Sequence, residues 1–192
     1  MDPILAKVLI HNTRTTDVKT IKNIYLDFIK DQTDKSIITD KMPYNFLFIG
    51  LIKSIFPKAK FVHVSRNPIG NCFSVYKNYF SNNSHFYTNQ LENIIDYYNF
   101  YKKTTSYWED IYINDIYNLR YEKLIINRED EIKKLISFCN LKWNLDYLKP
   151  HKNKRLVFTA SAPQVRKKIY SNSVNNWKNY SKFLYPYMRR IN

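Results

Sequence analysis

Glycine is scarce in this chain: among 192 residues, only Gly50 and Gly70 occur. A loop that cradles phosphate groups needs several glycines, because the backbone must approach the anion closely. Two isolated glycines cannot build such a loop. The sequence therefore excludes the usual glycine-rich nucleotide motifs.

Cysteine, metal-ligand patterns and long apolar runs are also scarce. The two cysteines, Cys72 and Cys139, lack metal or redox spacing and fall in apolar helical patterns, so we expect buried, reduced thiols. The four histidines are not spaced as metal ligands, and we expect no metal. No run approaches the roughly 18 apolar residues of a membrane span. The N-terminal segment MDPILAKVLI does not resemble a signal peptide, which predicts a cytoplasmic location.

Positive charge is abundant. Lys and Arg number 31 against 16 Asp and Glu, giving a net charge of +15 that suits anionic ligands. A second explanation stays open, because Lys, Asn, Ile and Tyr are all frequent where the coding DNA is rich in A and T. The hydrophobic fraction of 44% indicates a globular fold, and 192 residues fit one domain of ordinary size.

The segment Lys60–Phe80, KFVHVSRNPIGNCFSVYKNYF, predicts a buried strand, a tight turn and a helix. Asn67 is a good N-cap, and Pro68 suits the first helical position. Arg66 would then lie at a helix N-terminus, where unpaired N–H groups favour an anion. Ser74 follows eight residues later and offers a hydroxyl to the same anion. This segment is typical of a phosphate-binding site.

Other segments predict an alternation of helices and strands. We expect helices over 17–32, 44–56, 89–108 and 129–139, strands over 36–39 and 113–119, and a helical tail from Trp177 to Met188. Consecutive strand–helix units imply parallel strands with ligands at their carboxyl ends. Lys41 and Arg66 would follow two such strands and lie on the same rim.

Three segments together resemble a known family. Arg66…Ser74, the upstream DKMPYNF at 40–46 and the downstream SAPQVR at 161–166 resemble the sulfotransferases that use 3′-phosphoadenosine-5′-phosphosulfate (PAPS), in the bacterial and protein-tyrosine branch. The resemblance extends from Ile37 to Met188. It implies an α/β fold of three layers with a mainly parallel central sheet, related to the P-loop NTPases, as one domain over residues 1–192.

The resemblance also implies roles for particular residues. Arg66 and Ser74 would bind the 3′-phosphate, and Tyr121, in the segment RYEKL at 120–124, would lie near the nucleotide. Gln164 and Arg166 would complete the cofactor site. Lys41 and Ser161 match residues regarded as stabilising the transition state. The activity implied is sulfuryl transfer from PAPS to a hydroxyl acceptor, leaving 3′,5′-diphosphoadenosine (PAP).

The chain departs from the family pattern at several points. The glycine-containing loop for the 5′-phosphosulfate is absent, and so is the glutamate base that follows it in the tyrosine-directed branch. Met42 and Pro43 replace the His-containing motif of the small-molecule branch, and Asn78 and Asn176 stand where relatives have basic contacts. We therefore expect an N-terminally incomplete domain, the C-terminal part of a longer enzyme (either a split-gene product or a truncated copy), that is inactive alone and whose missing loop would come from an upstream polypeptide.

An alternative from another functional class stays open. The same charge and aromatic content fit a non-catalytic basic module that binds nucleotide or RNA by electrostatic attraction and ring stacking. The two hypotheses, a PAPS-binding sulfotransferase and a basic binding module, predict a different dependence of binding on salt concentration and on Arg66.

Overall fold

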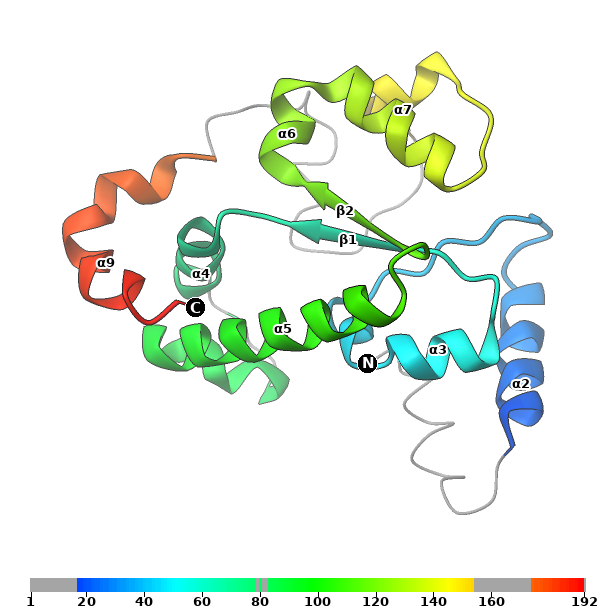
Figure 1. Ribbon diagram of the computed structural model, residues 1–192, viewed down its shortest axis with the longest axis horizontal. Helices are drawn as coiled ribbons and strands as arrows, with labels where there is room; N and C mark the ends of the chain where they lie inside the picture. The colour runs from blue at the N-terminus through cyan, green and yellow to red at the C-terminus, as the bar shows by residue number, and fades with distance from the viewer. Residues whose placement is uncertain (1–16, 79, 81–82, 154–173, 192) are drawn as a thin grey trace. The chain divides into compact units, whose positions relative to one another are not determined.

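A computed structural model describes residues 17–78, 80, 83–153 and 174–191 of the chain (Figure 1). These residues combine helices with a small parallel sheet, which places the chain in the α/β class. They divide into two compact units. Unit 1 holds residues 17–59 and 103–115, and unit 2 holds the described residues of 60–102 and 116–191.

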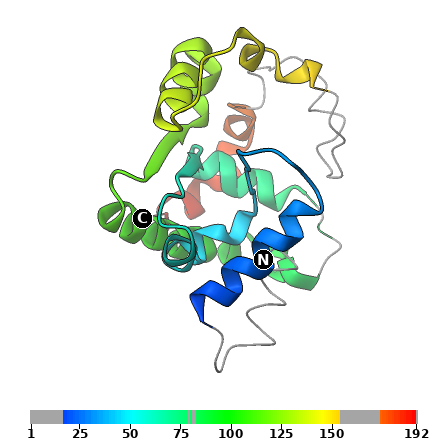
Figure 2. The ribbon, with the colours of Figure 1, turned by 90° about the vertical axis from the view of Figure 1, so that its right-hand side faces the viewer.

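Unit 1 is helical and begins with α2, Val18–Lys30, where the sequence predicts a helix. Asp17 is the N-cap, and its side chain accepts a hydrogen bond of 2.7 Å from the Thr20 N–H. α2 packs on α3, Ile49–Ile55, and the core between them is built on Ile21 and Ile55 (Figure 2). The helix predicted over 17–32 is confirmed, and it spans Val18–Lys30.

The strand predicted over 36–39 is wrong. These residues form neither a helix nor a strand, and Ile37 and Ile38 are 60% and 44% exposed. β-branched residues favour a strand only where a pairing partner and a packed face exist. Lys41 therefore follows an irregular segment and not a parallel strand.

The helix predicted over 44–56 is interrupted. A 3-10 helix, η1, covers Pro43–Leu47, and α3 begins after Phe48. Gly50 of α3 lies against the Trp108 ring, because a Cβ built there would come within 2.6 Å of the ring. This glycine makes room for a tryptophan, and it has no part in a phosphate loop.

Unit 2 contains the sheet. β1, Phe61–Ser65, pairs in parallel with β2, Ile116–Arg120, in a register that sets Phe61 opposite Ile116 and Ser65 opposite Arg120 (Figure 1). Both predicted strands are confirmed as strands, but the expected burial of β1 is wrong, because Val62 and Val64 are 41% and 56% exposed. The register matters for function, because it fixes which residues meet where the strands end.

The remaining helices are α4 Pro68–Tyr76, η2 Asn83–Asn89, α5 Leu91–Ile111, α6 Tyr121–Ile126, α7 Arg128–Phe138, η3 Leu145–Leu148, η4 Pro150–Lys152, η5 Asn176–Tyr180 and α9 Ser181–Met188. Of these, α6 and α7 contact β2. The helices expected over 89–108 and 129–139 and the helical tail are confirmed. α6 was not predicted, since its six residues are too few to show an apolar period.

The core of unit 2 lies between α4, α5 and α9. Its buried residues are Cys72, Leu91, Ile94, Ile95 and Leu184. Both cysteines are free thiols, with Cys72 buried and Cys139 half-buried. α5 therefore packs Leu91, Ile94 and Ile95 into the core. None of the helices that the structure describes has the length and apolar content needed to cross a membrane.

Candidate functional site

The turn after β1 has the local geometry that the sequence predicts. Asn67 is the N-cap of α4, and its side-chain oxygen accepts a hydrogen bond of 2.9 Å from the Gly70 N–H. Pro68 occupies the first helical position, where its fixed φ suits a helix. Arg66 is thereby placed directly between the end of β1 and the start of α4.

The parallel register brings this turn against the residues that follow β2. Because Ser65 lies opposite Arg120, the next residues along each strand, Arg66 and Tyr121, are also neighbours. The Arg66 guanidinium carbon lies 5.4 Å from the centre of the Tyr121 ring, within the range of a cation–π contact. Two residues that the family resemblance assigns to one nucleotide site are thus in contact.

Glu122 extends the same pairing by one residue. The Asn67 N–H donates a hydrogen bond of 2.7 Å to Glu122 Oε1, and the contact is partly buried. The other carboxylate oxygen, Oε2, is buried and has no hydrogen-bond partner within the described residues. The segment RYEKL contains this glutamate, but its local pattern predicts no role for it.

The N-terminus of α4 is therefore already partly used by the protein. Pro68 has no N–H, the Gly70 N–H bonds the Asn67 side chain, and the Asn67 N–H bonds Glu122. An anion bound here depends on the Arg66 guanidinium more than on helix N–H groups. The expectation of several unpaired N–H groups is met only in part.

Ser74 and Lys41 occupy different surroundings. Ser74 lies half-buried in α4, roughly 9 Å along the helix from Pro68 at a rise of about 1.5 Å per residue. Asn78 donates a hydrogen bond of 2.6 Å to the Ser74 carbonyl oxygen at the end of this helix. Lys41 is exposed in unit 1, next to Asp40, whose carboxylate accepts a hydrogen bond of 3.0 Å from Tyr25.

The remaining predicted site residues, Ser161, Gln164 and Arg166, lie outside the residues that the structure describes. Within the described part of the chain, no three His, Cys, Asp or Glu residues are grouped as metal ligands. The predicted association of these three residues with Arg66 stays a prediction.

His63 has a structural role in the middle of β1. Its Nδ1 lies 2.9 Å from the Asn118 side-chain oxygen, and its Nε2 is hydrogen-bonded to the Tyr101 hydroxyl. Both ring nitrogens are therefore occupied within unit 2. These contacts support a structural role for His63.

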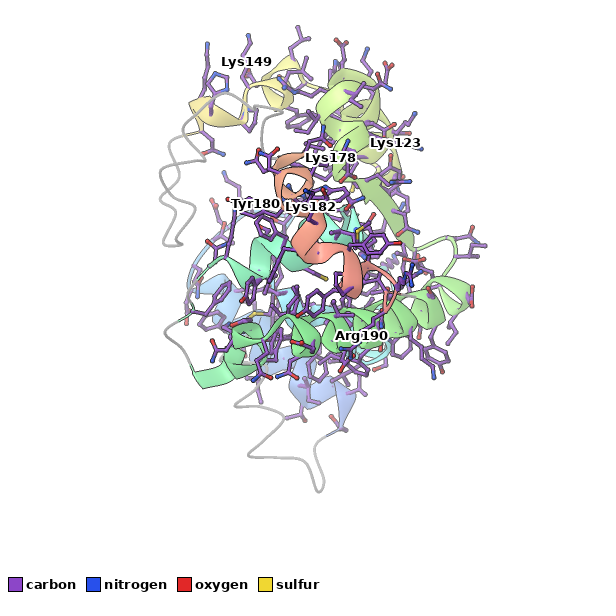
Figure 3. All side chains as sticks on the ribbon, turned by 90° about the vertical axis from the view of Figure 1, so that its left-hand side faces the viewer. Lys123, Lys149, Lys178, Tyr180, Lys182 and Arg190 are labelled. Carbon is purple, nitrogen blue, oxygen red and sulfur yellow. The ribbon has the colours of Figure 1, made fainter. Side chains whose placement is uncertain are left out.

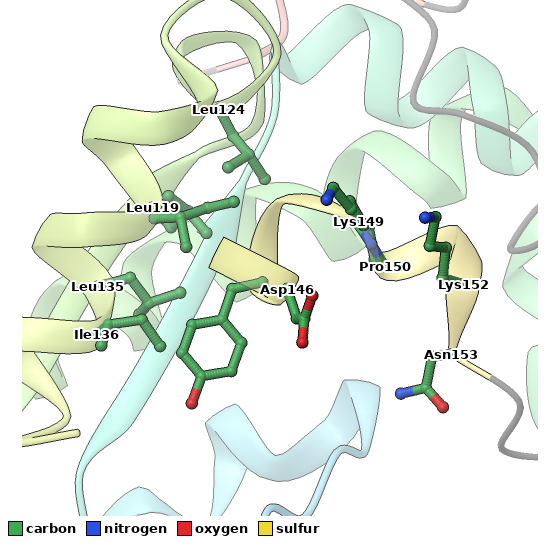
Figure 4. Close-up of a pocket in the computed structure, with 11 residues that line it drawn as sticks. Leu119, Leu124, Leu135, Ile136, Asp146, Lys149, Pro150, Lys152 and Asn153 are labelled. Carbon is green, nitrogen blue, oxygen red and sulfur yellow. The ribbon is translucent and has the colours of Figure 1, made fainter. Parts of the chain in front are cut away.

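A separate apolar cavity of about 740 Å³ lies beside β2 (Figure 4). Leu119, Leu124, Leu135 and Ile136 line it from β2, α6 and α7, while Lys149 and Lys152 approach it from the segment after η3. Arg66 and Tyr121 are not among its lining residues. Aliphatic side chains line this cavity from β2, α6 and α7, and polar side chains line it from the segment 146–153.

Unit 2 is thus a parallel strand pair that presents an arginine, a tyrosine and a capped helix at its carboxyl end, as α/β proteins that bind nucleotides do. Comparison with known proteins gives the family. The sequence model described as "Sulfotransferase family" matches residues 6–144, well over half of the chain. The chain belongs to the sulfotransferase family.

A relative is known from Aquifex aeolicus (strain VF5), where it is described as an uncharacterized protein. It is 36% identical to the chain over 172 residues, which cover 88% of the chain and 23% of the relative. The chain therefore spans less than a quarter of the length of the relative that it matches.

Proposed function

We propose that the chain binds the 3′-phosphate end of PAPS and takes part in sulfuryl transfer from PAPS to a hydroxyl acceptor. The family membership supports the reaction class. The observation that carries the proposal is the contact of Arg66 with Tyr121 at the carboxyl ends of β1 and β2. In this proposal residues 1–192 form one sulfotransferase-like domain, with a mainly parallel sheet between helical layers.

Arg66 would read the 3′-phosphate. A guanidinium offers a planar pair of donors that matches two phosphate oxygens, and charge-assisted bonds of this kind are the strong ones. Tyr121 holds the guanidinium from one side and offers a ring beside the nucleotide. The Ser74 hydroxyl, on the helix that Arg66 precedes, would add a neutral hydrogen bond to the same phosphate.

Sulfuryl transfer makes one bond and breaks another at sulfur. The acceptor oxygen bonds to sulfur, the bond between sulfur and the 5′-phosphate oxygen breaks, and PAP leaves with the bonding electron pair. Lys41 and Ser161 would stabilise the charge that develops on the leaving oxygen, by analogy with phosphoryl transfer. The acceptor proton passes to a base that this sequence does not identify.

The 5′-phosphosulfate requires a cradle from elsewhere. Both glycines already make room for tryptophans, since a Cβ at Gly50 would come within 2.6 Å of Trp108 and one at Gly70 within 2.9 Å of Trp177. In this proposal a second polypeptide segment brings a glycine-containing loop to the site. The chain would supply the 3′-phosphate half.

Removing Arg66 tests the nucleotide site. We expect Arg66→Ala to weaken PAP binding by about 2–3 kcal/mol, the worth of a hydrogen bond between charged partners. Binding of AMP, which lacks the 3′-phosphate, should change far less. Calorimetry with both ligands measures the difference.

Arg189→Ala is the matched control. Arg189 is exposed and directly follows α9, and its replacement by alanine changes the net charge by the same amount as Arg66→Ala. It should leave both affinities unchanged. Equal weakening of PAP and AMP by Arg66→Ala would mean that Arg66 does not read the 3′-phosphate.

A second candidate function rests on an exposed aromatic and basic surface. Tyr180 and Phe183, from η5 and α9, are 53% and 52% exposed, and Phe183 stacks on the exposed Tyr76 of α4. Lys178 and Lys182 extend beside Tyr180 (Figure 3). Exposed rings flanked by lysines suit the bases and phosphates of single-stranded RNA.

Salt dependence separates the two candidates. An RNA-binding surface gives a steep decrease of affinity in a log–log plot against salt, whereas a nucleotide pocket gives a shallow one for PAP. Tyr180→Ala with Lys182→Ala should weaken RNA binding and leave PAP binding intact. Steep RNA binding that survives Arg66→Ala together with Ser74→Ala, in a protein that does not bind PAP, would favour the second candidate.

A further inference from the structure

Glu122 connects the two segments that form the candidate site. Its Oε1 accepts the Asn67 N–H at 2.7 Å, while the preceding residue, Tyr121, contacts the preceding residue of the turn, Arg66. Two neighbouring residues of α6 thus hold two neighbouring residues of the β1–α4 turn. The strand register produces this correspondence, since Ser65 and Arg120 are directly opposite.

The position of Asn67 gives this hydrogen bond a consequence for Arg66. Asn67 is the N-cap of α4, and its backbone is not helical, with φ −46° and ψ 125°. Its side chain already bonds Gly70, and its carbonyl oxygen accepts the Asn71 N–H at 2.8 Å. The contact with Glu122 fixes the remaining group, the backbone N–H on the Arg66 side. The peptide bond between Arg66 and Asn67 is then held by α6.

We propose that Glu122 is a positioning residue for Arg66, setting the peptide plane from which the guanidinium reaches a 3′-phosphate. The inference rests on the proposed function. Glu122 acts through Oε1, which accepts the Asn67 N–H. A side chain of the length of glutamate is needed to bring an acceptor oxygen to this N–H. The contact requires an acceptor oxygen at the position of Oε1, whereas Oε2 has no hydrogen-bond partner within the described residues.

Three substitutions separate length from charge. Glu122→Gln keeps the length and an acceptor oxygen, and it removes the charge. Glu122→Asp keeps the charge and is one methylene too short to reach the Asn67 N–H. Glu122→Ala removes both. Positioning by the acceptor predicts that Gln preserves selectivity for the 3′-phosphate and that Asp and Ala lose it.

The measurement is the ratio of the Kd values for AMP and PAP. We expect the ratio to fall about tenfold in Glu122→Asp and Glu122→Ala, the loss that follows when a charge-assisted contact is misaligned. Glu122→Gln should keep the ratio within about threefold of the original protein, since a change of that size is below 1 kcal/mol. A merely structural role would weaken both ligands together and leave the ratio unchanged.

Glu129→Ala is the matched control, because Glu129 is exposed in α7 and pairs with Lys133 at 2.7 Å without contacting the turn. It should leave the ratio unaltered. Should Glu122→Ala fail to fold, the comparison of Asp with Gln decides the question alone. A ratio that falls equally in Gln and Asp, or in neither, overturns the proposal.

Failure of the inference differs from failure of the proposed function. If the original protein binds PAP no better than AMP, the 3′-phosphate site itself is refuted. If it prefers PAP, loses that preference in Arg66→Ala and keeps it in Glu122→Asp, only the role of Glu122 is refuted.

Discussion

Cys72 shows what burial does to one ionisable group. Its side chain is 3% exposed in the core of unit 2, and burial raises the pKa of the thiol from 9.0 to about 12. The nearby Tyr98 hydroxyl also has a raised pKa, chiefly because of burial and next because of Cys72. A thiol of this kind is inert, since the thiolate is the reactive form. We assign Cys72 to packing.

The raised pKa of Cys72 predicts a loss of stability in alkali. The folded protein keeps its proton up to about pH 12, whereas the unfolded chain releases it near pH 9. The free energy of unfolding should therefore decrease above pH 9, by about 1.4 kcal/mol per pH unit from this group. Urea titrations at pH 8 to 10.5 on the protein and on Cys72→Ala isolate it from the lysines and tyrosines. Equal pH slopes for the two proteins would contradict the assignment.

The sequence predicts the role of a residue where that role depends on its neighbours along the chain. It does not predict a role that depends on the register between two strands. Asn67 as a cap and Pro68 as the first helical residue follow from local chemistry, and both are confirmed. Glu122 meets Asn67 across 55 residues, through a register that no local pattern encodes. The contact between Arg66 and Tyr121 was anticipated only because the resemblance placed both residues at one nucleotide.

In α3, helix propensity and side-chain packing make opposite demands on position 50. Helix propensity favours alanine there, whereas packing against Trp108 favours glycine. Alanine is favoured over glycine in a helix interior by about 1 kcal/mol. A Cβ at Gly50, however, would lie 2.6 Å and 2.9 Å from two atoms of the Trp108 ring, and overpacking costs about 1–3 kcal/mol. Gly50 is the second residue of α3, where the propensity gain is smallest, so packing should win.

We therefore predict that Gly50→Ala destabilises the protein by about 1–3 kcal/mol relative to the original. Replacing Trp108 by a smaller residue should remove the clash, so Gly50→Ala should cost much less in a Trp108→Leu background. Chemical denaturation of the four proteins in this double-mutant cycle gives the coupling energy. A cycle without coupling would show that the ring moves aside freely.

Elements with a long apolar period were predictable, and short ones were not. α2, α5 and α7 lie within about three residues of their expected bounds, because each repeats an apolar face over several turns. The segment 36–39 has the β-branched residues of a strand but no partner strand among the described residues, and it remains irregular. Propensity alone could not reveal that a partner was missing.

For the whole molecule, binding and turnover make different demands. In the proposed function, binding of the 3′-phosphate would need only the turn after β1 and the start of α6, and both belong to unit 2. Turnover also needs a cradle for the 5′-phosphosulfate, a cation at the leaving oxygen and a base. The relative that matches the chain extends far beyond it, and the matched region is 23% of that protein. We propose that the remaining functions lie on such additional chain or on a partner.

This division predicts that residues 1–192 alone bind PAP but transfer sulfuryl groups from labelled PAPS at a rate near background. The chain has two glycines, and each packs closely against a tryptophan ring. The sequence therefore has no further glycines from which to build a glycine-rich cradle. Adding a polypeptide with such a loop, separately or as a fusion, should raise turnover with a hydroxyl acceptor.

Lys41→Ala should then abolish most of that turnover, by analogy with other cationic groups at a developing charge. Lys58→Ala, at another exposed lysine of unit 1, is the matched control and should have little effect. Rapid sulfation by residues 1–192 without any addition would refute the division, since the chain would then contain its own cradle.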